Sequence, residues 1–163
     1  MSFLPEPFYR EVEQSIPIAC VDIVPLRENH GAVEVGLILR ESPFGRVWCH
    51  LGGRILRGET MHAALQRHVR DTLDVELLLQ PNRQPDFVFE WFPPELAPTD
   101  GTLFGNDPRK HAIGLSFALP LVNDATPRPQ NEALDFGFFA PDALPLPLWP
   151  GTMTLLHKLQ VVA

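Results

Sequence analysis

The stretch HLGGRILRGETMHAALQRHVRDTLDVEL, residues 50–77, contains the change of pattern that decides the fold. It opens with the end of an apolar segment, passes two adjacent glycines, and then repeats its apolar side chains every three or four positions. Thr60 stands directly before this repeat, where a helix N-cap is expected. The stretch therefore predicts a strand, a tight glycine turn and an amphipathic helix over residues 60–73.

The segments around this stretch predict further strands and two further helices. Runs of β-branched and aromatic residues predict strands over residues 16–26, 32–40, 45–53, 86–92, 111–121 and 133–140. Helices are expected over residues 6–14 and 151–162, and an irregular loop from Phe92 to Lys110 is expected to form a lid. Strands on both sides of one central helix predict an α+β fold, an α/β/α sandwich with a mixed sheet between helices.

The composition narrows the classes of function. A chain of 163 residues is expected to form one domain over residues 1–163. The net charge of -7 argues against nucleic-acid binding, so an anionic ligand would need a few locally placed arginines. No apolar run approaches the roughly 20 residues of a membrane span. Cys20 and Cys49 lie in apolar runs, which predicts buried thiols in a reducing, cytoplasmic setting.

The spacing inside the opening stretch is typical of phosphate chemistry. Five residues separate Gly53 from Glu59, and seven separate Glu59 from Arg67. With aliphatic residues at positions 69 and 75, the chain resembles the Nudix box, G-x5-E-x7-R-E-U-x-E-E-x-G-U, where U is aliphatic. The match is partial, because His68 and Thr72 stand where the box has glutamate.

The resemblance implies a hydrolase assisted by a divalent metal, Mg²⁺ or Mn²⁺, held by carboxylates on the helix. With fewer carboxylates than a full box, this chain is expected to bind Mg²⁺ more weakly. The expected metal ligands are the backbone of Gly52 and the side chains of Glu59, Asp71 and Glu132. Alternatives stay open at three positions. Glu59 either joins the metal or clamps Arg67, His68 is either a ligand or a solvated side chain, and Glu132 is a ligand, a base or a solvated loop residue.

A closer similarity, to the GDP-mannose mannosyl hydrolase branch of the superfamily, covers most of the chain. It includes FLPEPFYREVEQSIPIACVDIV, LILR, HLGGRILRGE, KHAIGLSF and LDFGFFAPDAL. The similarity implies hydrolysis of a nucleoside diphosphate sugar or a related derivative. It places Asp22 near the sugar, Arg40 on the diphosphate, and Arg54 and Arg67 where they neutralise the leaving diphosphate. The branch also implies a homodimer, for which the apolar segment of residues 3–9 is a candidate docking element.

Two features of that branch are missing here: its main helix carboxylate for the metal, which falls on Thr72, and its base histidine. The histidine that acts as base in the branch falls on Ala133, which leaves Glu132 as the candidate base. The lid region is open to two interpretations. Trp91 either stacks on a base or belongs to the core, while Arg109, Lys110 and His111 either reach phosphate or cap a strand. The alternative function is a catalytically weak or inactive Nudix fold that binds a nucleotide or a protein partner.

Overall fold

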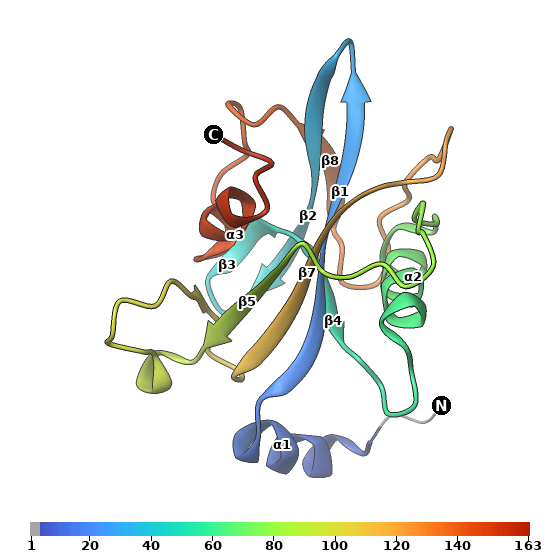
Figure 1. The fold of residues 1–163 in the computed structure, drawn as a ribbon. Helices are drawn as coiled ribbons and strands as arrows, with labels where there is room; N and C mark the ends of the chain where they lie inside the picture. Colours follow the sequence, from blue (N-terminus) through green and yellow to red (C-terminus); the bar gives the residue numbers. More distant parts are fainter. Residues whose placement is uncertain (1–3) are drawn as a thin grey trace.

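The computed structural model describes residues 4–163, in which eight strands form one mixed sheet (Figure 1). The strand order is β3-β2-β1-β7-β5-β6, with β4 paired to β1 and β8 paired to β2. β1 runs parallel to β7, and β5 runs parallel to β6. The strands are β1 (Ile18–Asn29), β2 (Ala32–Ser42), β3 (Gly45–Cys49), β4 (Leu51–Arg54), β5 (Phe87–Phe92), β6 (Gly105–Asn106), β7 (Ala112–Pro120) and β8 (Asp135–Phe139).

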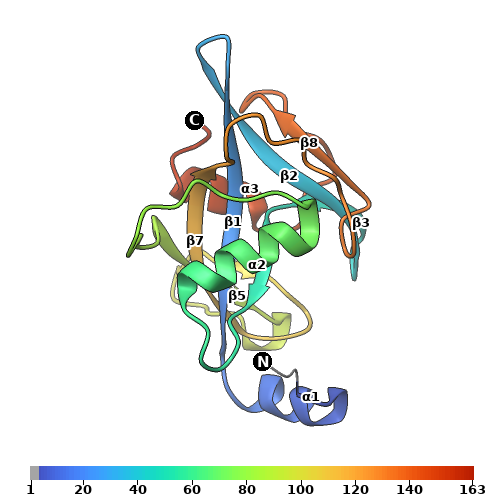
Figure 2. The ribbon, with the colours of Figure 1, turned by 90° about the vertical axis from the view of Figure 1, so that its right-hand side faces the viewer.

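Two helices cover opposite faces of the sheet, as Figures 1 and 2 show for α2 (Met61–Leu73) and α3 (Thr152–Lys158). This arrangement confirms the predicted sandwich with a mixed sheet between helices. The side chain of Thr60 caps α2 by accepting a hydrogen bond from the backbone N–H of Ala63 at 3.1 Å. The first helix, α1 (Glu6–Ser15), lies beyond one end of the sheet and has no buried residue.

The segment predicted as one strand over residues 45–53 is divided at His50. β3 pairs with β2, whereas β4 pairs with β1, so the chain changes partner at this residue. Gly52 permits the change because its φ is +138°, and a Cβ there would lie 2.0 Å from the carbonyl oxygen of Val21. The close approach of β4 to β1 brings the glycine pair beside Asp22, whose Cα partner is Gly52.

The loop from Phe92 to Lys110 is more regular than its composition predicts. It contains a short 3₁₀ helix, η1 (Pro94–Leu96), and the strand β6, which returns to pair with the end of β5. Gly105 makes this pairing possible, because a Cβ there would lie 2.0 Å from the Trp91 ring. The expectation of a wholly irregular lid was therefore wrong: part of the loop extends the sheet.

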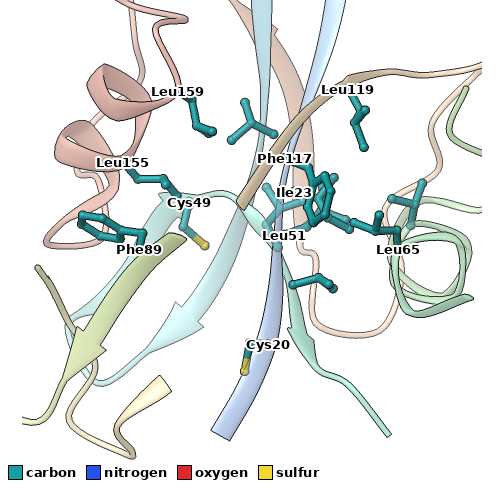
Figure 3. Packing of buried hydrophobic residues seen from close by; sticks show 14 of the residues in the cluster. Cys20, Ile23, Cys49, Leu51, Leu65, Phe89, Phe117, Leu119, Leu155 and Leu159 are labelled. Carbon is teal, nitrogen blue, oxygen red and sulfur yellow. The ribbon is translucent and has the colours of Figure 1, made fainter. Parts of the chain in front are cut away.

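The apolar core occupies both faces of the sheet (Figure 3). Leu65 of α2 lies on one side near Phe117, and Leu155 of α3 lies on the other side near Cys49. Both cysteines are free thiols, and burial raises the pKa of each to about 12. Among residues 4–163, no helix has both the length and the apolar character that a membrane span requires.

Candidate functional site

A pocket of about 180 Å³ lies where β1, β4 and β5 meet the segment of residues 107–110. Its charged lining is balanced between three acidic and three basic side chains. These are Asp22, Asp107 and Glu132, and Arg40, Arg109 and Lys110. Cys20, His50, Gly52, Gly53, Trp91, Ala112 and Trp149 complete the lining. Six residues of the predicted site are thus brought together here, namely Asp22, Arg40, Gly52, Trp91, Lys110 and Glu132.

Asp22 lines this pocket, and both of its carboxylate oxygens contact neighbouring side chains. Its Oδ2 accepts from Trp91 Nε1 at 3.0 Å and from Ser116 Oγ at 3.2 Å. His50 Nε2 lies 3.3 Å from its Oδ1. Gly114 leaves the space for this carboxylate, since a Cβ there would lie 2.0 Å from Oδ2. With 4% exposure, Asp22 is a buried group that positions its neighbours.

His50 is a pocket residue that the sequence did not reveal. Its ring stacks on Trp91 with the centroids 5.0 Å apart, and its Nδ1 is buried without a hydrogen-bond partner. Trp91 is itself 4% exposed, so it belongs to the core and also lines the pocket. The only sequence signal for His50 is its place directly before the Leu51–Gly52–Gly53 turn.

Each arginine of the pocket has an acidic partner. Arg40 Nη1 lies 2.6 Å from Glu132 Oε2. Arg109 binds Asp107 twice, with Nε 2.8 Å from Oδ1 and Nη2 2.9 Å from Oδ2. Burial raises the pKa of Asp107, but the hydrogen bonds from Arg109 and the charges of Arg109 and Lys110 outweigh burial and lower the pKa overall. Asp107 is therefore ionised at neutral pH and compensates its neighbours.

Arg67 and Arg54 lie outside the lining of this pocket. Arg67 donates from Nε and Nη2 to the two carboxylate oxygens of Glu59, at 2.7 and 2.8 Å. These bonds lower the pKa of Glu59, which also accepts the backbone N–H of Leu56 at 2.9 Å. The guanidinium of Arg54 lies over the Tyr9 ring, 3.7 Å from its centroid. Glu59 therefore acts as a clamp on Arg67 in this structure.

In a Nudix box, the side chains at positions 68, 71 and 72 of the helix would face a metal. Here His68, Asp71 and Thr72 lie in different surroundings. His68 packs against Gly53 and has Nε2 3.1 Å from the carbonyl oxygen of Arg54, and burial lowers the pKa of its ring. Thr72 is 3% exposed, whereas Asp71 is exposed. The backbone carbonyl of Asp71 accepts a hydrogen bond from Asn131 Nδ2, which ties α2 to the loop that carries Glu132.

The expected metal ligands are not arranged as a metal site. Glu59 is occupied by Arg67 and Glu132 by Arg40, and neither Glu59 nor Asp71 lines the pocket with Gly52. Within the described part of the chain, no three His, Cys, Asp or Glu side chains are grouped to hold a metal ion. These donors do not fit the oxygen-rich cage that Mg²⁺ requires.

His111 lies next to the pocket without lining it. Its ring stacks on Phe92 with the centroids 4.2 Å apart, and its Nε2 is 3.8 Å from Glu90 Oε1. It lines a neighbouring depression together with Arg109 and Lys110. The segment of residues 109–111 therefore separates two hollows, and only its first two side chains reach the charged pocket.

Known structures share this fold. A protein of Jonesia denitrificans, described as a possible asymmetric diadenosine tetraphosphate hydrolase, is 28% identical over 91% of this chain and 98% of its own, with a TM-score of 0.74. A MutT Nudix hydrolase of Burkholderia pseudomallei is 20% identical over 88% and 98% of the two chains, with a TM-score of 0.62. The Nudix domain of Shewanella oneidensis NrtR, solved with ADP ribose, is 18% identical over 96% and 97%, with a TM-score of 0.61.

Comparison with sequence families gives a match over nearly the whole chain, while no curated protein sequence matches it significantly. The matching family is described as "Domain of unknown function (DUF4916)" and covers residues 2–155. The chain thus belongs to the DUF4916 family, and its fold is that of the Nudix hydrolases.

Proposed function

We propose that the protein is a Nudix-type hydrolase of a nucleoside diphosphate derivative, such as a nucleotide sugar. The observation that carries the proposal is the convergence of Arg40, Arg109 and Lys110 on one pocket in a chain whose net charge is -7. Guanidinium and ammonium groups suit phosphate oxygens by geometry and charge. The similarity to a possible diadenosine tetraphosphate hydrolase supports a substrate that contains linked phosphates.

Some pocket residues would bind the diphosphate, and one, Glu132, can accept a proton. Arg40 and Lys110 would hold the diphosphate and stabilise the negative charge that develops on it as the bond breaks. Glu132 has a side chain that is 31% exposed, so water can reach it, and it would accept the proton of the attacking water. Asp22 has its oxygens occupied, so it would position Trp91 and His50 beneath the sugar.

One further set of observations favours the alternative of a binding protein with little or no activity. The helix that bears the metal carboxylates in the Nudix box has Thr72 buried and His68 bonded to a backbone carbonyl. Because the donors present do not fit a metal cage, the catalytic steps above use only side chains of the protein. When bound, a divalent cation such as Mg²⁺ would supply further stabilisation of phosphate charge.

The experiment that separates these functions measures binding and turnover together. Wild type would be melted with UDP, GDP, GDP-mannose and ADP-ribose, and the same compounds would be assayed for hydrolysis with and without Mg²⁺ or Mn²⁺. We expect a rise in melting temperature by mass action with at least one diphosphate. Binding accompanied by turnover supports the hydrolase, and binding alone supports the alternative. If no diphosphate raises the melting temperature, the hydrolase and the nucleotide-binding alternative are both rejected, and binding of a protein partner is left as the function.

Assembly and location are part of the same proposal. We expect a homodimer, because Leu4, Phe8 and Ile16 at and near α1 are all about half exposed. Phe3 of the apolar segment proposed for docking lies outside the described residues. A monomer mass by light scattering at every concentration would reject the dimer. The two free buried thiols support a reducing compartment, the cytoplasm.

A further inference from the structure

The segment of residues 147–150 connects the two outermost strands of the sheet. On one side, Trp48 of β3 donates its backbone N–H to Pro147 at 2.9 Å, and Trp149 donates to the carbonyl of Trp48 at 2.9 Å. On the other side, Asn106 of β6 donates to Pro150 at 3.1 Å and accepts from Trp149 Nε1 at 2.6 Å. Because both strand edges hold this segment, Trp149 has a fixed position at the pocket.

Two arginines from distant parts of the chain contact the Trp149 ring. The guanidinium carbon of Arg40 lies 5.8 Å from the ring centroid, and that of Arg109 lies 5.0 Å from it. Guanidinium groups at this distance are attracted by the negative face of an indole. Trp149 is 5% exposed, so the ring is covered and these contacts occur in a partly dry environment. The tryptophan thus holds one arginine from β2 near one from the loop before β7.

Asp107 further orients Arg109. Its two hydrogen bonds use only part of the donor capacity of the Arg109 guanidinium. The two bonds to Asp107 come from Nε and Nη2, and a guanidinium has a third nitrogen, Nη1, with which to reach an anion. Arg54 and Arg67, by contrast, contact Tyr9 and Glu59 outside the pocket.

We propose that Arg109 is a diphosphate-binding residue that acts together with Arg40, and that Trp149 is the positioning residue that sets the geometry of the pair. The inference rests on the proposed function, because it assumes that a diphosphate occupies the pocket. Arg40 is then the first phosphate-binding arginine and Arg109, in the loop before β7, the second. The sequence alone left two interpretations open for this loop, phosphate contact and strand capping.

The test is calorimetric binding of UDP, inorganic pyrophosphate and uridine to wild type and five variants with matched melting temperatures, one of which is Arg40→Ala. Arg109→Gln should weaken UDP and pyrophosphate binding by roughly ten- to a hundredfold, the effect of one charge-assisted contact, and leave uridine binding unchanged. Trp149→Leu should weaken both anions by roughly two- to thirtyfold through lost arginine positioning. Trp149→Phe should stay nearer to wild type, because it keeps an aromatic face. Arg70→Gln is the control, because Arg70 pairs with Glu76 on an exposed surface.

The comparison of the two tryptophan variants separates positioning from folding. Both lose the Nε1 bond to Asn106, so a merely structural role would make them equally weak, and that result would overturn the role of Trp149. If UDP binds wild type and Arg40→Ala weakens it while Arg109→Gln does not, the assignment of Arg109 fails and the proposed function stands. If neither UDP nor pyrophosphate binds wild type, both the inference and the diphosphate function fail.

Discussion

Arg67 and Glu59 form a bidentate ion pair that joins the first turns of α2 to the turn before it, with the Arg67 Nε–Glu59 Oε1 distance at 2.7 Å. The Glu59 side chain is 2% exposed and the Arg67 side chain 23% exposed. Arg67 Nη2 also donates to the carbonyl oxygen of Arg54 at 3.0 Å, so one guanidinium joins α2, the turn and the end of β4. The spacing by which the chain resembles the Nudix box thus brings together two residues that form a structural ion pair.

Replacing Arg67 should therefore reduce stability more than ligand affinity. In Arg67→Ala, the Glu59 carboxylate would lose two charge-assisted hydrogen bonds, which costs about 3 kcal/mol of unfolding free energy. For a chain of this length the melting temperature should fall by roughly 6 to 12 °C. Differential scanning calorimetry measures the loss, with Arg70→Ala as the exposed control.

The same variant tests the role that the family resemblance gives to Arg67. Below its melting temperature, Arg67→Ala should bind UDP as wild type does, because Arg67 does not line the charged pocket. A variant that melts like wild type but binds UDP at least tenfold more weakly would restore Arg67 to the phosphate site.

The Glu59 clamp also predicts a pH dependence. Arg67 holds the pKa of Glu59 below its ordinary value in the folded state. A lowered folded pKa stabilises the protein above the unfolded pKa, and this stability is lost as pH falls through the folded value. The melting temperature of wild type should thus fall as the pH drops below about 4.5, the ordinary pKa of a glutamate, while Glu59→Gln should be less stable at neutral pH and should lose less stability in acid. The pKa values of Asp107, Glu34 and Asp100 are also lowered, so these carboxylates contribute the same sign of slope in both proteins. Parallel curves for the two proteins would refute the assignment.

Local patterns predicted the helices and most strands, because the period of apolar residues and the Thr60 cap are encoded within a few residues. The division of one predicted strand at His50 was not predictable, because it depends on which partner strand each half meets. The candidate site shows the same difference between local patterns and contacts with distant strands. Arg40 was predicted from the family resemblance and Lys110 from its place at the end of the loop before a strand. Trp149 is held at the pocket by hydrogen bonds to two distant strands, which no local pattern encodes.

Glu132→Gln should separate affinity from turnover. Glu132 neutralises Arg40 at 2.6 Å, so a diphosphate must compete with this carboxylate. Removing the charge should tighten UDP binding by up to about fivefold, the value of a partly exposed ion pair. If Glu132 is also the base, hydrolysis should fall by roughly 10² to 10⁴ in the same variant.

Isothermal titration and single-turnover assays measure the two effects of Glu132→Gln separately. Glu41→Gln is the matched control. Glu41 follows Arg40 in β2, and it pairs with Arg46 on the exposed surface, outside the pocket. Weaker UDP binding in Glu132→Gln would show that the carboxylate supports the ligand instead of competing with it.

The response to Mg²⁺ follows from the positions of the four expected ligands. Glu59 and Glu132 are paired with arginines, Asp71 is exposed, and Gly52 contributes only backbone. Mg²⁺ prefers near-octahedral oxygen ligands, and assembling them here would require breaking two ion pairs. We therefore expect millimolar Mg²⁺ without nucleotide to leave the melting temperature nearly unchanged, in wild type and in Asp71→Asn alike. A rise with Mg²⁺ that disappears in Asp71→Asn would show that Asp71 binds the ion, and a rise lost only in Glu132→Gln would place the ion at the Arg40 side of the pocket.

Thr72→Glu completes the series, since Thr72 is 3% exposed and a carboxylate there would be buried. It should lower stability by several kcal/mol unless Mg²⁺ compensates the charge, so recovery of its melting temperature on adding Mg²⁺ would reveal a metal position that the helix still preserves.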